Sequence, residues 1–320
     1  MVNMYPLIIL TGPTAVGKTK ISIALAKAIG GEIISADSMQ VYRHMDIGSA
    51  KVQKEEMEGI PHYLIDCLEP TEEFNVVLFQ KLAKQAMAQI WSDHKIPIIV
   101  GGTGFYIQSV LYDIDFTEHE EDKEYRAYLE ALAREKGNHC LYEMLLEKDP
   151  ESASIIHENN SKRVIRALEF YAQTGTKISA HNETEKQKRS PYDFHYFVLT
   201  DEREKLYANI DKRVDLMLEQ GLVREVLKLK EMGCNRDSVS MQGLGYKEIL
   251  AYLNEECSLE EAVYLIKRDT RHFAKRQLTW FRRERDVCWV DKSVVGESTE
   301  ALLHYMEDII KIENRKKQIQ

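Results

Sequence analysis

The chain carries the stretch LIILTGPTAVGKT at residues 7–19, and this stretch decides the fold. Residues 12–19 fit the pattern G-x-x-x-x-G-K-[ST] at every fixed position. The apolar residues 7–10 before it predict a short buried strand, and residues 21–29 after it have the apolar spacing of a helix that stops at Gly30-Gly31. A strand, a glycine turn and a helix N-terminus together bind anions, because backbone N–H groups converge there and the helix dipole adds positive potential.

The predicted phosphate loop adds a charge and a hydroxyl to this backbone cradle. Lys18 supplies a full positive charge, and the hydroxyl of Thr19 can ligate Mg²⁺. A chance match in a glycine turn is disfavoured because both flanks are correct. The loop therefore predicts binding of a phosphate or diphosphate, without saying which molecule carries it, through Gly12, Pro13, Thr14, Ala15, Val16, Gly17, Lys18 and Thr19.

Short apolar strands alternate with helices over the first 116 residues. We expect strands at 32–36, 62–66 and 96–100 and a helix at 76–91. Strands that are apolar throughout indicate a parallel sheet covered on both faces. The predicted fold class is therefore α/β, a P-loop NTPase-like parallel sheet flanked by helices. Ligands of such sheets bind at the carboxyl ends of the strands.

The pattern becomes purely helical from about residue 117. Helices are expected at 121–135, 140–148 and 162–173, and a polar stretch at 181–190 leads to a strand at 196–199. The remainder predicts helices at 203–220, 223–232 and 246–253, a long helix after Ser258, a strand at 287–290 and a final helix. Residues 117–190 therefore form an inserted all-helical subdomain, and residues 1–116 with 191–320 form the catalytic core.

Composition limits the compartment and the partners. No run of 18 apolar residues is present, which predicts no membrane span, and five scattered cysteines without a C-x-x-C pair predict a cytoplasmic protein without structural zinc. We expect a monomer. The net charge is −9, yet residues 267–286 hold eight basic and three acidic residues, a local excess of +5. This segment and the clusters at 162–166 and 186–189 are either solvated helix faces or a nucleic-acid surface.

Polar residues follow two of the predicted strands. Asp37 comes directly after the strand at 32–36, where a carboxylate suits a general base or a magnesium ligand. Alternatively it caps the following turn. Thr103 lies in Gly101-Gly102-Thr103-Gly104 and could reach a phosphate oxygen, although a plain strand-to-helix turn explains the same glycines.

Six blocks in this order resemble the bacterial tRNA dimethylallyltransferases, also called tRNA isopentenyltransferases. The resemblance extends from residue 7 to about residue 289, and six blocks in register make coincidence negligible. The family transfers a dimethylallyl group from its diphosphate to N6 of the adenosine at tRNA position 37, 3′ of the anticodon. The blocks are GPTAVGKT at 12–19, DSMQVY at 37–42, GGTGFY at 101–106, KRVIRALE at 162–169, GLGY at 243–246 and KRQLTW at 275–280.

The resemblance implies a role for each block. Asp37 would take the proton from the adenine amine, while Lys18, Thr19 with Mg²⁺, and Thr103 would serve the departing diphosphate. The Gln40 side chain has a donor and an acceptor, which suits hydrogen bonding to the edge of an adenine. The adenosine must flip out of the anticodon loop to reach the site. The implied partners are dimethylallyl diphosphate and the anticodon stem-loop of a tRNA. The implied tRNA contacts are Asp37, Ser38, Met39, Gln40, Thr103, Arg126, Lys162, Arg163, Val164, Ile165, Arg166, Gln242, Gly243, Gly245, Tyr246, Lys247, Arg276, Gln277 and Trp280.

A small-molecule kinase with the same phosphate loop is the alternative function. It would hold ATP in the loop and would need a lid that bears arginine. The inserted block and the basic segment at 267–285 fit a macromolecular acceptor better.

Overall fold

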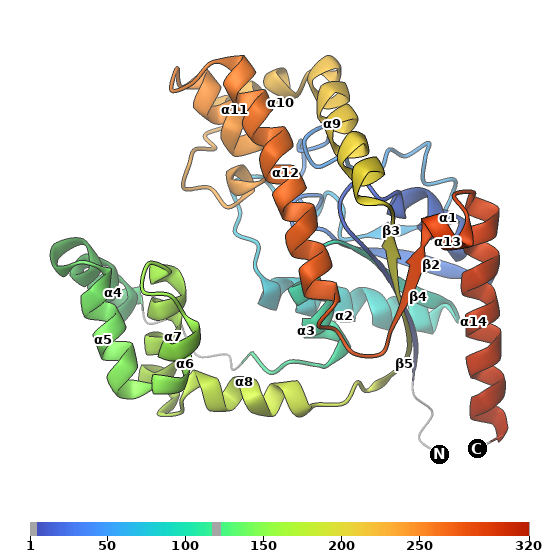
Figure 1. Cartoon of the computed structure of the whole chain (residues 1–320), viewed down its shortest axis with the longest axis horizontal. Coiled ribbons are helices and arrows are strands. Elements are labelled where there is room, and N and C mark those ends of the chain that lie inside the picture. The colour runs from blue at the N-terminus through green and yellow to red at the C-terminus, as the bar shows by residue number, and fades with distance from the viewer. Residues whose placement is uncertain (1–4, 117–122, 320) are drawn as a thin grey trace. The chain divides into compact units, whose positions relative to one another are not determined.

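Six parallel strands form a single sheet in the computed structural model, which describes residues 5–116 and 123–319. The strand order is β3-β2-β4-β1-β5-β6. A sheet with helices around it agrees with the predicted α/β class (Figure 1). The strands are β1 (Tyr5–Thr11), β2 (Gly31–Ala36), β3 (His62–Tyr63), β4 (Ile96–Gly101), β5 (Tyr192–Thr200) and β6 (Val287–Asp291).

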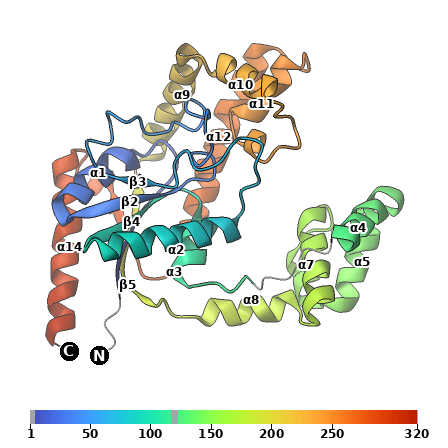
Figure 2. The same cartoon turned by 180° about the vertical axis from the view of Figure 1, so that it is seen from behind.

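The sheet is covered on both faces because its crossovers run in opposite directions. Helix α1 (Lys18–Ile29) leads from β1 to β2, and α2 (Val76–Ser92) leads back from β3 to β4. Right-handed crossovers in opposite directions place their helices on opposite faces. The view from behind in Figure 2 shows α2 along its face of the sheet.

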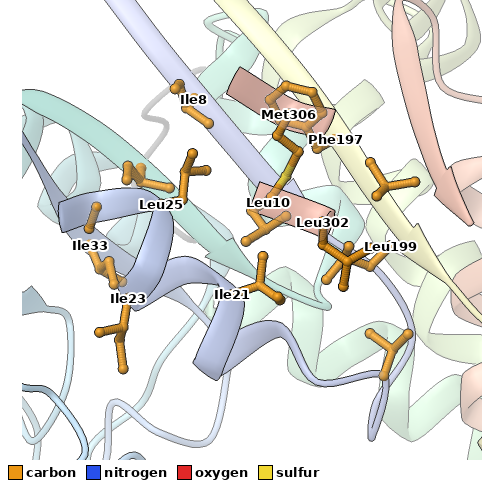
Figure 3. Close-up of a cluster of buried hydrophobic side chains, with 14 of the residues drawn as sticks. Ile8, Leu10, Ile21, Ile23, Leu25, Ile33, Phe197, Leu199, Leu302 and Met306 are labelled. Carbon is orange, nitrogen blue, oxygen red and sulfur yellow. The ribbon is translucent and has the colours of Figure 1, made fainter. Parts of the chain in front are cut away.

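The main core lies between the sheet, α1 and α14 (Thr299–Ile319). Ile8 and Leu10 of β1 pack there with Leu25 of α1 and Met306 of α14 (Figure 3). Side chains alternate along a strand, so Leu7 and Ile9 point to the other face. Both are fully buried as well, which explains why the strand reads as an unbroken apolar run.

The chain divides into two compact units. Unit 1 comprises Met1–Leu111 with Pro191–Gln320, and unit 2 comprises Tyr112–Ser190. The sequence placed the boundary at residue 117, which lies outside the described residues. Unit 1 also contains the helices α3 (Gly104–Leu111), α9 (Arg203–Gln220), α10 (Leu222–Glu231), η1 (Ser240–Gln242), α11 (Tyr246–Leu253), α12 (Leu259–Phe281) and α13 (Lys292–Val295).

All secondary-structure elements among the described residues of unit 2 are helices, and the unit has its own core. Leu129, Leu141, Leu145, Val164 and Leu168 form the centre of that core. The part of the chain that the structure describes contains no helix with the length and apolarity of a membrane span. The helices of unit 2 are α4 (Lys123–Lys136), α5 (Asn138–Lys148), α6 (Pro150–Ile155), α7 (Ser161–Thr174) and α8 (Ile178–Gln187).

Two elements differ from the sequence prediction. The strand expected at 62–66 is only two residues long, because Leu64 and Asp66 adopt left-handed backbone with φ of 62° and 54°. The polar stretch at 181–190 is mostly helix α8. Its helical state is stabilised by the ion pairs Lys186–Glu183 (3.3 Å) and Lys188–Glu185 (2.7 Å) at i,i+3 spacing.

Candidate active site

Three strand ends meet at one level of the sheet and position the candidate site. Thr11 of β1 and Ala36 of β2 are both in register with Gly101 of β4. Thr11 Oγ1 donates to Gly101 O at 2.6 Å. A Cβ at Gly101 would lie 2.3 Å from Ala36 O, so only glycine permits this approach. The loops after the three strands, which carry the phosphate loop, Asp37 and Thr103, therefore leave the sheet side by side.

The phosphate loop has the backbone that its sequence predicts. Gly12 and Gly17 have φ of 147° and 94°, and α1 begins at Lys18. Lys18 Nζ donates to the carbonyls of Gly12 and Pro13, both at 2.9 Å, which holds the ammonium within the turn. Below the loop, Lys292 pairs with buried Asp201 at 3.0 Å and Lys292 Nζ lies 3.5 Å from Val16 O.

A small cavity of about 60 Å³ joins the loop to the end of β2. Lys18 and Thr19 of the phosphate loop and α1 line it together with Asp37 and Gln40, which follow β2. Thr103 is not part of this lining; its carbonyl accepts from the N–H groups of Tyr106 and Ile107 and so begins α3. The turn interpretation of Thr103 is thus present in the structure.

Asp37 has two features that matter for chemistry. Its Oδ1 accepts from the N–H of Met39 at 2.8 Å and of Gln40 at 3.4 Å, which is the predicted capping geometry. Its charge also opposes the lowering of the pKa of Lys18. The carboxylate therefore shapes a turn and faces the phosphate loop at once.

Arg213 of α9 joins this group, and the sequence analysis did not identify it. Burial and the positive charge of Arg213 together lower the pKa of Lys18 to about 7. Burial also lowers the pKa of Arg213, whereas the charge of Asp37 raises it. Two cations and one carboxylate thus share the site, and the excess positive charge favours an anion. Among the many basic residues of the chain, no pattern distinguishes Arg213 before α9 is placed.

Helix α12 contacts both the phosphate loop and the loop after β4. The amide of Gln277 donates to Gly102 O at 3.0 Å and accepts from Thr14 N–H at 2.9 Å. Trp280 packs on Gly104, where a Cβ would lie 2.3 Å from its ring, and on Phe105. Gln277 is only 5 % exposed. Its side chain therefore holds two loops together in this structure, and its predicted tRNA contact stays a prediction.

Further predicted tRNA contacts divide into exposed and buried side chains. Lys162, Arg163 and Arg166 lie exposed on α7 and form no ion pair with a described residue. Val164 and Ile165 are buried in the core of unit 2, and their predicted tRNA contacts stay predictions. They are buried because they lie on the apolar face of the same helix.

Arg126 is held by an acidic partner within unit 2. Its Nε and Nη2 each donate to a carboxylate oxygen of Glu169 at 2.8 Å. Glu169 is buried, so this bidentate pair joins α4 to α7. The predicted tRNA contact of Arg126 stays a prediction.

The segment at 242–247 shows a similar division. Gln242 and Lys247 are exposed, whereas Gly243, Gly245 and Tyr246 are buried. Tyr246 donates to Glu225 at 2.8 Å instead of facing solvent, and its predicted tRNA contact stays a prediction. Elsewhere in unit 1, the side chain of Arg276 is exposed and lies over the ring of Phe273, with Cζ 5.7 Å from its centroid.

Comparison with known proteins decides the family. The family model described as IPP transferase matches residues 40–284, more than half of the chain. This chain belongs to the IPP transferase family. As a member of that family, it is 65 % identical over 289 residues to the tRNA dimethylallyltransferase of Lachnoclostridium phytofermentans, a match that covers 90 % of the chain and 92 % of the relative.

Solved structures of the family have the same fold. The full-length tRNA isopentenylpyrophosphate transferase of Bacillus halodurans superposes with a TM-score of 0.72 and 42 % identity, covering 98 % of this chain and 99 % of that one. The tRNA delta(2)-isopentenylpyrophosphate transferase of Staphylococcus epidermidis gives 0.71 and 45 %, covering 97 % and 99 %. The P-loop fold predicted from the sequence is confirmed by these matches.

Proposed function

We propose that this enzyme transfers a dimethylallyl group from dimethylallyl diphosphate to N6 of the adenosine at tRNA position 37. The observation that carries the proposal is a phosphate loop and a carboxylate that line one cavity, in a chain 65 % identical to a tRNA dimethylallyltransferase. An anion cradle suits the diphosphate, and Asp37 lines the same cavity, where an acceptor amine needs a base.

The transfer breaks one bond and forms another. The N6 lone pair attacks the allylic carbon of the donor, the carbon–oxygen bond to the diphosphate breaks, and Asp37 takes the proton that N6 loses. Negative charge grows on the departing diphosphate. Lys18, Arg213 and the backbone N–H groups of the loop stabilise that charge.

Magnesium fits this site as a partner of the diphosphate. Thr19 presents a hydroxyl on the cavity wall at the first turn of α1. The described residues contain no cluster of three or more His, Cys, Asp or Glu side chains that could hold a metal. This suits Mg²⁺, which keeps waters and phosphate oxygens and needs few protein ligands. When bound, the ion would neutralise charge on the leaving group.

Two observations support the proposed contact with tRNA: the exposed positive charges of α7 and the similarity of the chain to a tRNA dimethylallyltransferase. We propose that Lys162, Arg163 and Arg166 of α7 bind phosphates of the anticodon arm, because all three are exposed cations on one short segment. A monomeric, cytoplasmic enzyme is part of this proposal.

The experiment combines the purified protein, isotopically labelled dimethylallyl diphosphate and a transcribed tRNA with adenosine at position 37. We expect label in the tRNA, N6-dimethylallyladenosine on mass spectrometry of the digested nucleosides, and release of one diphosphate per transfer. The matched control is the same tRNA with guanosine at position 37. Unlabelled tRNA together with stoichiometric consumption of ATP would instead support the small-molecule kinase.

A further inference from the structure

The carboxylate of Glu225 on α10 accepts hydrogen bonds from the loop at residues 46–48, which follows Asp37 in the chain. One of its carboxylate oxygens accepts from the N–H of Asp46 at 2.9 Å and of Ile47 at 2.8 Å. The other accepts from the N–H of Gly48 at 3.0 Å and from the hydroxyl of Tyr246 at 2.8 Å. Three consecutive backbone donors on one carboxylate leave this stretch of loop little freedom to rotate.

Close packing presses the same loop against α11. A Cβ at Gly48 would lie 2.5 Å from the ring of Tyr246, and a Cβ at Gly243 would lie 2.7 Å from the sulfur of Met39. Tyr246 is fully buried, so its ring cannot move aside at low cost. Burial and the charge of Glu225 raise the pKa of Tyr246 well above its usual value, so its hydroxyl stays protonated and donates.

The loop at residues 46–48 is followed directly by Ser49 and Ala50, whose carbonyl groups accept hydrogen bonds from Gln40. Gln40 Nε2 donates to Ser49 O and Ala50 O, both at 3.4 Å. Gln40 Oε1 accepts from Ser35 Oγ at 3.1 Å, and the backbone N–H of Gln40 donates to Asp37. The orientation of this amide therefore depends on the position of the residues next to Gly48.

We propose that Glu225, oriented by Tyr246, is a positioning residue that holds the Gln40 amide beside Asp37 for recognition of the acceptor adenine. It acts through the backbone of residues 46–50 and touches no substrate. The inference rests on the proposed function, because the amide needs a fixed orientation only if a base is read there. An uncharged amide in place of Glu225 would point an NH₂ group at one of these hydrogen-bond donors.

The first test uses Glu225→Gln and Tyr246→Phe in the full-length enzyme, with Glu231→Gln at the exposed end of α10 as the matched control. We expect kcat/KM for tRNA to fall about tenfold or more, because small misplacements near the chemistry have large effects. The melting temperature should fall moderately because hydrogen bonds to the Glu225 carboxylate are lost, while its rise with inorganic diphosphate and the KM for dimethylallyl diphosphate should stay close to wild type. A parallel loss of diphosphate binding would overturn the inference in favour of a general structural role.

The second test is a double-mutant cycle with Gln40→Ala. If Glu225 acts through Gln40, Glu225→Gln should change kcat/KM for tRNA less than about twofold once Gln40 is absent, since coupled residues are not additive. Fold-losses that simply multiply would overturn the positioning role. A wild-type enzyme that leaves tRNA unmodified would instead reject the proposed function, so the two failures are distinguishable.

Discussion

Asp37 combines a turn-forming oxygen with a place opposite the phosphate loop, and these two roles can be separated. Asp37→Asn keeps an oxygen for the N–H of Met39 but cannot take a proton. We expect both Asp37→Asn and Asp37→Ala to lower kcat by roughly 10²–10⁴-fold, the usual contribution of a general base. Steady-state kinetics at saturating tRNA measures this. If Asp37→Asn keeps more than about a tenth of wild-type kcat, Asp37 is a turn former only.

Lys18 should make diphosphate binding depend on pH. Its pKa is about 7 in the free protein, and a bound anion raises it again. Above pH 7, binding must therefore take up a proton, and affinity should fall by up to about tenfold per pH unit until the pKa of the complex is reached. Titration calorimetry with inorganic diphosphate, in buffers of different ionisation enthalpy, should show close to one proton taken up at pH 8.

The control for this prediction is Lys18→Met, which should bind diphosphate weakly and without the proton uptake. Wild-type enzyme that takes up no proton at pH 8 would show that Lys18 is already charged. Below pH 7 wild-type Lys18 is mostly protonated before binding, so its contribution to the pH dependence should disappear there.

Helix α12 is hydrogen-bonded to the phosphate loop through the amide of Gln277. Gln277→Leu leaves the partly buried Thr14 N–H and Gly102 O without that partner, and each lost hydrogen bond destabilises the fold by about 0.5–1.5 kcal/mol. We expect a lower free energy of unfolding in urea and weaker diphosphate binding. Gln220→Leu at the exposed end of α9 is the matched control. Equal stability of the two variants would contradict the role of this amide.

Helix α7 should contribute to the salt dependence of tRNA binding. Each lost phosphate contact lowers the log–log slope by close to one unit, so Lys162→Ala with Arg163→Ala should weaken affinity and lower the slope by about 1–2. Lys136→Ala, an exposed cation on α4, is the control. A double variant with the slope of wild type would leave the tRNA surface to α12, and binding of inorganic diphosphate should be unchanged in all variants.

The elements that follow apolar periodicity were predictable from the sequence, and those that depend on local polar partners were not. The sequence predicts the strands around the phosphate loop and helix α7 correctly, because their burial imposes a regular pattern of apolar residues. Helix α8 has no buried residue, so it left no apolar stripe to detect. In the site, Lys18 and Asp37 were found from motifs. Arg213 and the buried state of Gln277 depend on how α9 and α12 pack on the sheet.

At the scale of the whole molecule, unit 2 has a polar centre of its own. The buried carboxylate of Asp149 accepts from the N–H and hydroxyl of both Ser152 and Ser179, and so caps α6 and α8 together. Removing a cap costs about 0.5–2 kcal/mol. We expect Asp149→Ala to lower hydrogen-exchange protection in α6, α7 and α8, while peptides of β1 and α1 keep theirs.

The control for this prediction is Glu135→Ala, an exposed acid on α4. Because the two units have separate cores, inorganic diphosphate should raise the melting temperature of Asp149→Ala as it does for wild type. Loss of protection throughout the sheet would show instead that the two units unfold as one.

The strand order has a consequence for synthesis on the ribosome. β1 is made before the other five strands of this sheet, yet its neighbours β4 and β5 end only at Gly101 and Thr200. At about 5–20 residues per second, roughly 10–40 s separate the appearance of the phosphate loop from completion of its second flanking strand. During that interval an apolar segment next to the N-terminus has no complete sheet to join. Early in synthesis the nascent chain should therefore depend on chaperones that bind unfolded segments. The cavity beside the phosphate loop should be among the last parts to reach its final structure.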